Sequence, residues 1–377
     1  MSHVNGPVDV VIVGGGVMGS AAAWRLAARG RRVTLLEQFE RGHHRGASHG
    51  SSRIYRQAYD GQFHTALAAR ALPLWRQLEE TTGTRLLDLT GAVDHGLPDA
   101  VHAKARSLTE LGIDHTLLTP DQAEQRWPGI RFDTTVLFHP DAGRLHADRA
   151  VAALQQAAAD AGAEVRHTSG VRLIRETTGG VEVVLDDTVI YARHVVVAAG
   201  AWTRTLLDAA DLTARPVLPP LRTTQEQPAH FVPVSDADWP SFVHHRGAQL
   251  TGEGIYGLGS VDGIKIGEHG TGPQVDPDTR SFVADPAGVE RLVEYARTWL
   301  PGVDADSARV DTCLYTTTPD SNFVVDRTGA VTVAAGFSGH GFKFGPAIGG
   351  LVADLADGIA TAPEPFRFGS RQQVGVS

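Results

Sequence analysis

The stretch VDVVIVGGGVMGSAAAWRLAARGRRVTLLE, residues 8–37, decides the fold. An apolar run rich in β-branched residues ends in GGGVMG, residues 14–19, which fits G-x-G-x-x-G. An alanine-rich helical segment and a second short apolar run follow, and the stretch closes on Glu37. Strand, glycine turn, helix, strand and acid in this order are typical of a dinucleotide-binding βαβ unit. The stretch therefore predicts an α/β fold with a Rossmann-like domain.

Each part of this unit has a role in holding a dinucleotide. The first glycine of the motif permits the tight turn, the second lets the backbone approach a pyrophosphate, and the third allows the helix to pack closely on the strand. The pyrophosphate would lie on the helix N-terminus, where N–H groups and the helix dipole favour negative charge. The acid would accept hydrogen bonds from ribose hydroxyls, which favours NAD or FAD over NADP. A glycine-rich turn in another kind of α/β protein is the alternative. The predicted cofactor-binding residues of the unit are Gly14, Gly16, Val17, Met18, Gly19 and Glu37.

Composition limits the class of protein. The chain has 377 residues, enough for two domains, with 42% hydrophobic and 20% charged residues, as in ordinary globular proteins. Its net charge of −9 gives no general attraction to nucleic acid or anionic membranes, and no apolar run approaches the length of a membrane span. One cysteine, and 17 histidines without an H-E-x-x-H motif, predict neither an intramolecular disulfide nor a metal site. Since the first residues also lack the basic segment of a signal peptide, we expect a cytoplasmic protein with no nucleic-acid or membrane partner.

Beyond the first unit, helical and strand-like segments alternate. The C-terminal part again shows a strand, a glycine loop and a helix, which predicts its return to the nucleotide domain. The polar stretch at residues 41–60 is either a solvated loop or part of a site, and its place after a parallel strand favours the site. Helices are expected over residues 64–80, 100–111, 146–161, 289–299 and from about 346, and strand segments over 164–184, 193–202, 255–258, 264–266 and 331–336.

Four separated motifs together resemble one family. They are GGGVMG (14–19), GASHGSSRIYRQAY (46–59), DTCLYTTTPDSNFVVD (311–326) and GFSGHGFKFGPAIG (336–349). Taken in this order, they are similar to the monomeric sarcosine oxidase and N-methyltryptophan oxidase group of the glycine/D-amino-acid oxidase (DAO) family of flavoenzymes. The resemblance runs almost end to end, and its last two motifs are the most specific.

The resemblance implies an architecture and an activity. The architecture is an FAD-binding domain of glutathione-reductase type (1–85, 145–215 and 305–377), interleaved with a mainly antiparallel β-sheet substrate domain (86–144 and 216–304). The activity is that of an FAD-dependent oxidase of N-methyl or other secondary α-amino acids. Such an enzyme oxidises the amine C–N bond to an imine, reduces oxygen to hydrogen peroxide, and is expected to be a monomer.

The resemblance also assigns roles to single residues. Cys313 matches a cysteine that bonds covalently to the flavin 8α-methyl group, the alternative being a buried free thiol. Arg56 and Lys343 match cations that hold the substrate carboxylate, as charge-assisted hydrogen bonds can; the alternative is exposed side chains on a helix face. Lys265 matches a lysine near flavin N5 that promotes the reaction with oxygen, or it is an ordinary outward-facing lysine on a strand.

The same resemblance implies further site residues. Arg53 and His49 match positions near the flavin ring, whereas His269, Tyr256 and Tyr315 match positions that line the substrate pocket. Arg53, Cys313 and Lys343 are also predicted to bind the cofactor, and the remaining predicted cofactor-binding residues are Ser48, Gly200, Gly339, Gly341 and Phe342.

Two departures from the family pattern concern the substrate. Glu268 stands where an aromatic or apolar residue is expected, and Leu258-Gly259 replaces a Phe-Pro pair. Both changes are expected at the substrate site, so they question sarcosine itself more than the reaction type.

Three rival functions stay open at this point. The substrate could be a cyclic imino acid such as proline or pipecolate, or a larger N-alkyl or glycated amino acid. The enzyme could instead be a dehydrogenase that passes electrons to a quinone or a carrier protein. From another class, the chain could be a non-catalytic FAD-binding subunit, although the three cations Arg56, Lys265 and Lys343 speak against it.

Overall fold

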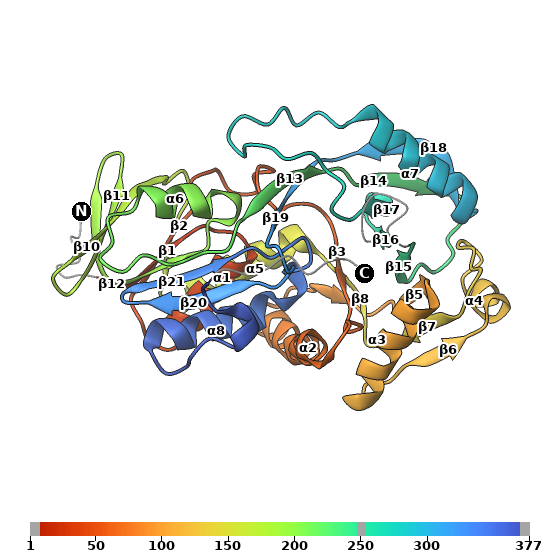
Figure 1. Cartoon of the computed structure of the whole chain (residues 1–377), viewed down its shortest axis with the longest axis horizontal. Helices are drawn as coiled ribbons and strands as arrows, with labels where there is room; N and C mark the ends of the chain where they lie inside the picture. Colours follow the sequence, from red (N-terminus) through yellow and green to blue (C-terminus); the bar gives the residue numbers. More distant parts are fainter. Residues whose placement is uncertain (1–7, 247–253, 370–377) are drawn as a thin grey trace.

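The protein, a computed structural model that describes residues 8–246 and 254–369, contains two eight-stranded sheets toward opposite ends of its long axis (Figure 1). The first has the order β10-β11-β12-β1-β2-β9, with β21 beside β12 and β20 beside β21. Its pairs β12–β1, β1–β2, β2–β9 and β12–β21 are parallel. The strands are β1 (Val8–Val13), β2 (Val33–Leu36), β9 (Glu164–Arg166), β10 (Val171–Thr177), β11 (Gly180–Leu185), β12 (Val189–Val197), β20 (Val324–Thr328) and β21 (Val331–Ala335).

Both faces of the parallel part are buried. Val10 and Ile12 of β1 point to one face, where they pack with α1, α5 and α8, and Val11 and Val13 point to the other, toward α6. Figure 1 shows α8 and α6 on opposite sides of the sheet. Because successive strand residues point to opposite faces, a strand covered on both sides must be apolar throughout, as β1 is. The helices are α1 (Val17–Ala28), α5 (Ala147–Asp160), α6 (Thr203–Ala209) and α8 (Gly345–Asp357).

The second sheet has the order β18-β14-β17-β16-β15-β5-β7-β6 and is antiparallel except at β15–β5. Leu292 and Tyr295 of α7 pack on one face with Phe231, Phe242 and Ile266. The mainly antiparallel second sheet is therefore as expected. Its elements are β5 (Ala92–Gly96), β6 (Thr116–Leu118), β7 (Val136–His139), β14 (Ala229–Pro233), β15 (Ser241–His245), β16 (Ile255–Ser260), β17 (Gly263–Glu268) and β18 (Val303–Val310), with α3 (Pro98–Glu110), α4 (Pro120–Arg126) and α7 (Pro286–Trp299).

Smaller elements lie between the two sheets. Strands β3 (Arg53–Tyr55), β8 (Gly143–Leu145) and β4 (Leu87–Asp88) form one small sheet, and β13 (Arg222–Glu226) pairs with β19 (Cys313–Thr317). Helix α2 (Gln62–Thr82) continues through Pro73, and short 3₁₀ turns lie at Gly200–Trp202, Phe342–Phe344 and Glu364–Phe366. No helix among the described residues is both long and apolar enough to cross a membrane.

The chain passes repeatedly between the two sheets. Strand β21 pairs in parallel with β12, so the C-terminal segment returns to the first sheet as expected. The expected helices are present, but the region expected as two strands at 164–184 holds three, because β9 leaves to pair with β2 before the β10–β11 hairpin begins. The division into two domains stays a prediction. Residues 1–7, 247–253 and 370–377, which it assigns to these domains, lie outside the described residues. The boundary at 304/305 falls inside β18, which pairs with β14 of the second sheet.

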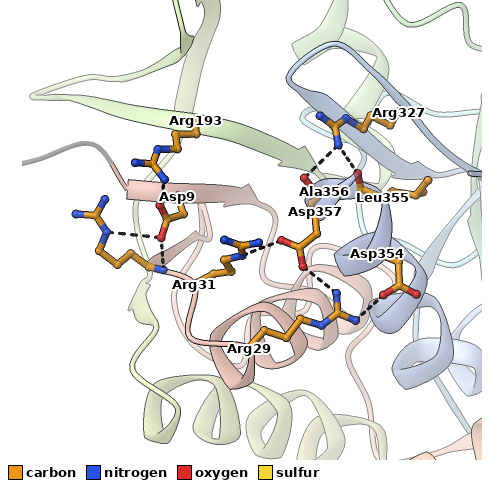
Figure 2. Close-up of polar contacts among 10 residues, drawn as sticks. Asp9, Arg29, Arg31, Arg193, Arg327, Asp354, Leu355, Ala356 and Asp357 are labelled. Atoms are coloured by element: carbon orange, nitrogen blue, oxygen red, sulfur yellow. Dashed lines mark hydrogen bonds and ion pairs between the residues drawn. The ribbon is translucent and has the colours of Figure 1, made fainter. Parts of the chain in front are cut away.

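Salt bridges fasten the first βαβ unit to the C-terminal helix (Figure 2). Just after α1, Arg29 contacts Asp354 (2.6 Å) and Asp357 (3.0 Å), and Arg31 contacts Asp357 (2.8 Å). Arg327 donates to two carbonyl groups in the last turn of α8. These cations lie at the helix end where the dipole is negative, so they complement α8 as well as its aspartates.

Close packing in the βαβ turn gives a stability prediction. A Cβ on Gly19 would collide with the Gly14 carbonyl oxygen, whereas a Cβ on Gly350 in α8 would meet nothing within 4 Å. We expect Gly19→Ala to lower the free energy of unfolding by about 1–3 kcal/mol, because the turn must shift. The control Gly350→Ala should be neutral or stabilising by up to about 1 kcal/mol. Urea unfolding compares the two variants, and equal losses in both would contradict the packing role of Gly19.

Candidate active site

A cavity of about 2050 Å³ opens between the first βαβ unit and the second sheet. Its lining includes Lys104, Gln155 and His245, which were not predicted as site residues. Gly19 does not line it, as expected for a glycine whose role is packing. The predicted site residues that line the cavity are Gly14, Gly16, Val17, Met18, Glu37, Ser48, His49, Arg53, Arg56, Gly200, Tyr256, Lys265, His269, Cys313, Tyr315, Gly339, Gly341, Phe342 and Lys343.

The glycine turn forms a cradle at the start of α1. Gly14 has φ +109°, and a Cβ there would collide with the Ala198 carbonyl group. Gly16 precedes the helix without a side-chain cap, and the Val17 N–H donates to Ser48 Oγ at 3.1 Å. A Cβ on Gly16 would lie 3.1 Å from that same oxygen. The first turn of α1 therefore presents backbone N–H groups to the cavity at close range, a geometry that suits a pyrophosphate.

The Glu37 carboxylate is held in place at the end of β2. Its Oε2 accepts from the Gly15 N–H at 2.8 Å and its Oε1 from the Phe39 N–H at 3.0 Å. Burial raises the pKa of Glu37, but hydrogen bonds from His43 and Phe39 outweigh it and hold the pKa below its usual value. Oε2 accepts from Gly15 alone among the described residues, so its second lone pair can still accept from a ribose hydroxyl. Gln155 completes this corner by donating to the Gly15 carbonyl at 2.9 Å.

Lys343 is buried in the wall of the cavity, with 5% of its surface exposed. Its Nζ donates to the Tyr59 hydroxyl at 2.7 Å and to the His340 carbonyl at 2.6 Å, while Trp75 Nε1 donates to the Lys343 carbonyl at 2.7 Å. The alternative of an exposed surface lysine is therefore wrong. Burial, and then the nearby Arg56, hold the pKa of Lys343 well below its usual value.

Arg56 lies beside Lys343 across the Tyr59 ring. Its guanidinium is 4.8 Å from the ring centroid, and its Nη1 donates to the Ala58 carbonyl at 2.6 Å and to Asp94 Oδ1 at 3.1 Å. Lys343 Nζ is 5.3 Å from the same centroid. The alternative of an exposed arginine on a helix face is wrong here too, because Arg56 lies after β3 and faces the cavity. Two cations thus share one wall of the cavity.

Lys265 reaches the cavity from β17 and is 7% exposed. Within the described part of the chain, its ammonium has no hydrogen-bond acceptor, and burial and then Arg53 lower its pKa to about 8. The outward-facing alternative is wrong, because one face of β17 packs into the apolar core with Ile264 and Ile266 while the other lines the cavity. Strict alternation of buried and exposed residues therefore does not apply to this strand.

Arg53, His49 and Cys313 lie near Lys265. The Arg53 guanidinium donates to the carbonyl groups of Ala47 and His49 at 2.8 and 2.7 Å, which folds the loop before β3 around it. Burial and then Arg53 lower the pKa of His49 to about 2, so its imidazole is neutral. Cys313 is a buried free thiol, and burial raises its pKa although Arg53 and Lys265 oppose this.

Aromatic side chains form the remaining wall. The rings of His269 and Tyr315 have centroids 5.2 Å apart, and Tyr256 lines the cavity with them. Gly339, at φ +74°, lies so close to the Tyr315 ring that a Cβ would collide with it. A glycine is therefore required for the C-terminal loop to close this wall.

One of the two sequence departures lies away from the cavity. Glu268 forms an ion pair with Arg291 of α7 at 2.7 Å and accepts from the Thr271 hydroxyl at 3.2 Å, and it does not line the cavity. The expectation that Glu268 alters the substrate site is thus wrong. Its carboxylate leaves the strand end toward α7, whereas His269 next to it turns inward. Leu258 does line the cavity, but Gly259 packs near Arg144 instead.

Three residues that position the site were not predicted from the sequence. Asp94 pairs with Arg56, Gln155 binds the glycine turn, and Arg280 donates to the carbonyl groups of His44 and Arg45 as well as to Gln225 and Thr312. The only local signal is a charged or amide side chain within an otherwise apolar element, as in AVDHG at 92–96. Such a signal gives no partner, because each partner is distant in the chain.

One group among the described residues has the composition of a metal site. It consists of His95, His244 and Asp133, whose ligand atoms lie within 4.8 Å of one another. However, the two imidazoles stack with centroids 4.1 Å apart and planes only 28° apart. Nitrogen lone pairs lie in the ring planes, so they do not converge on a common ion in this arrangement.

Comparison with known proteins identifies the family. The sequence profile of the FAD dependent oxidoreductase (DAO) family matches residues 9–355. The monomeric sarcosine oxidase of Streptomyces avermitilis is 34% identical over 362 residues, covering 92% of this chain and 93% of that protein. The N-methyl-L-tryptophan oxidase of Yersinia pestis is 29% identical, with coverages of 92% and 94%. The solved open form of NikD, an unusual amino acid oxidase essential for nikkomycin biosynthesis, superposes with a TM-score of 0.83 at 28% identity, covering 95% of this chain and 96% of that one.

The cradle and the family agree on the cofactor. Glycines that leave room for a backbone approach, a helix N-terminus open to the cavity and a fixed ionised Glu37 fit the diphosphate and ribose of FAD. This chain belongs to the DAO family of FAD-dependent oxidoreductases and acts on amine C–N bonds with FAD as its cofactor.

Proposed function

We propose that this enzyme is an oxidase of N-methyl or other secondary α-amino acids. The observation that carries the proposal is the presence of Arg56, Lys343 and Lys265 in the same cavity as the dinucleotide cradle. A dinucleotide-holding subunit without turnover has no need of three cations around one cavity, two of them, Lys265 and Lys343, buried without a carboxylate partner among the described residues. The relatives named sarcosine oxidase and N-methyl-L-tryptophan oxidase support a secondary amine as substrate.

The substrate would bind through its carboxylate. Arg56 and Lys343 both face the cavity, so a carboxylate between them would receive charge-assisted hydrogen bonds from two sides. His269, Tyr256 and Tyr315 would then enclose the rest of the amino acid and exclude water. When bound, FAD supplies the two-electron chemistry, by taking up a hydride equivalent from the carbon next to nitrogen and passing both electrons to oxygen.

The remaining predicted residues would act on the cofactor. Backbone N–H groups at Gly16 and Met18 would hold the diphosphate together with Ser48, whose hydroxyl oxygen accepts from the Val17 N–H, and Glu37 would hold the ribose. Arg53 and the neutral His49 would lie near the flavin ring, and Lys265 would place a positive charge where oxygen is reduced. We also propose that the enzyme is a monomer and that it is cytoplasmic. The relatives named monomeric sarcosine oxidase support the monomer.

A steady-state assay tests the proposed function and separates its rivals. Sarcosine, N-methyltryptophan, proline and pipecolate are offered in air, and oxygen uptake, peroxide and formaldehyde are measured together. Oxidation of an N-methyl group yields one formaldehyde per peroxide, whereas oxidation of a cyclic imino acid yields peroxide alone. Turnover that needs a quinone and consumes no oxygen would replace the oxidase by a dehydrogenase.

We further propose that Cys313 attaches the flavin covalently. The Cys313 thiol lines the cavity on β19, and Arg53 and Lys265 nearby partly oppose the rise in its pKa that burial causes. Cys313→Ala should therefore release all FAD into the supernatant on acid denaturation, whereas the wild-type flavin should sediment with the protein. Flavin that stays with the denatured variant would place the link elsewhere. Free flavin from the wild type would mean that Cys313 is only a buried thiol.

A further inference from the structure

We propose that Asp94 is a positioning residue, whose buried carboxylate holds the Arg56 guanidinium in the orientation that binds the substrate carboxylate. This inference rests on the proposed function, in which Arg56 and Lys343 receive that group. It assigns to Asp94 a role that acts through Arg56 and not by contact with the substrate.

Asp94 lies behind the wall of the cavity. It is 0% exposed and does not line the cavity, whereas Arg56 and His245 do. Asp94 Oδ1 accepts from Arg56 Nη1 at 3.1 Å and from His245 Nε2 at 2.8 Å. The Ala58 carbonyl accepts from the same Arg56 Nη1 at 2.6 Å. One corner of the guanidinium is thus fastened to the protein from two sides.

The rest of the guanidinium stays available for a ligand. Among the residues that the structure describes, none accepts a hydrogen bond from Nε or Nη2 of Arg56. A guanidinium has five N–H donors in a rigid fork, so fixing one corner also fixes the direction of the others. This is the arrangement needed for two parallel bonds to a carboxylate.

Packing alone does not account for Asp94. Within the described chain its Oδ2 is buried and has no hydrogen-bond partner. Burial of a half-satisfied carboxylate is unfavourable, and an apolar side chain would fill the same space without that cost. Although burial raises the pKa of Asp94, Arg56 and His245 hold it far below its usual value, so the group is an anion.

The charges of the wall suit one carboxylate. Arg56 and Asp94 carry opposite charges, and Lys343, whose pKa burial lowers, is favoured in its charged form when a carboxylate binds beside it. Asp94→Asn removes the anion, so charge alone would make a carboxylate bind more tightly. Loss of the anchor would make it bind more weakly. Because these two effects have opposite signs, the direction of the change decides between them.

The test uses holoenzyme and sodium propionate, a carboxylate without an amine, in a calorimetric titration. If Asp94 positions Arg56, Asp94→Asn should raise the Kd of propionate roughly 10-fold, the effect of one charge-assisted hydrogen bond. It should raise the KM of an oxidised amino acid by a similar factor, with a smaller change in kcat. Unchanged or tighter propionate binding would overturn the proposal, and so would a wild type that binds no propionate.

Asp88→Asn is the matched control. Asp88 is also buried and also accepts from an arginine and a histidine, Arg144 Nε and His146 Nε2, each at 3.0 Å. None of the three lines the cavity, so propionate affinity should not change. An equal loss in this variant would show that any buried aspartate matters, which contradicts a specific role of Asp94.

Two further variants separate positioning from folding. In an Arg56→Gln background, Asp94→Asn should cause no additional loss of propionate affinity, because the anchor has nothing left to hold. The same loss in both backgrounds would overturn the proposal. If Asp94→Asn does not fold, Arg56→Lys keeps the charge without the fork and should show the same 10-fold loss, and unchanged affinity would contradict the inference. A wild type that binds propionate but oxidises no amino acid would refute the proposed function. The propionate titrations would then still decide whether Asp94 positions Arg56.

Discussion

Replacing Lys265 by methionine is expected to slow the reaction of the reduced enzyme with oxygen about 10²–10³-fold, while reduction by substrate changes far less. Lys265 is a buried cation without an acceptor among the described residues, so its charge is available to the negative charge that develops as oxygen is reduced. Loss of one such preorganised group has this size in other enzymes. Methionine keeps the volume of the side chain, so the comparison with Lys265→Ala separates charge from shape. Stopped-flow measurement of each half-reaction is the test, and equal losses in both would contradict the assignment.

The same lysine predicts a pH dependence. Its pKa is about 8, so the ammonium is present below that pH and is lost above it. The rate of the oxygen reaction should therefore fall as the pH rises through about 8 in the wild type. In Lys265→Met this fall should be absent. A fall of the same size in the variant would assign the titration to another group.

Replacing Lys343 by alanine is expected to weaken carboxylate binding roughly 10- to 150-fold, corresponding to about 1.5–3 kcal/mol for a hydrogen bond to a charged group. Reduction of the enzyme should slow as well, because a loosely held substrate is poorly aligned. Lys343→Met keeps much of the packing against Tyr59 and Phe344, so it controls for the void that the shorter alanine side chain leaves. Anaerobic stopped-flow reduction at several substrate concentrations gives both quantities. Unchanged reductive kinetics would remove Lys343 from the substrate site.

Much of the fold was predictable because its signals are local. The βαβ unit follows from an apolar run, the glycine turn and a helical segment within 30 residues, and the return of β21 to the first sheet follows from a similar local pattern. The split of 164–184 into three strands was missed, since β9 has only three residues and its partner β2 lies far away in the chain.

The site was predictable where residue type alone restricts the chemistry. Gly14 and Gly16 are such positions, because a Cβ on either would meet the atoms that shape the cradle. The orientation of Glu268 was not predictable. Its partner Arg291 is 23 residues away in the chain, and no local pattern shows that α7 brings the two together. The pairing of Asp94 with Arg56 was missed for the same reason, because only the folded sheet brings β5 beside the segment after β3.

The central claim is that this chain oxidises a secondary amino acid with FAD held in its cavity. The most direct measurement is the absorbance spectrum of the purified protein without oxygen, before and after each candidate substrate is added. We predict a flavin spectrum that sarcosine, N-methyltryptophan or a related secondary amino acid bleaches, and that air restores with release of peroxide. A flavin spectrum that none of these amino acids bleaches, or a protein without flavin, would contradict the claim.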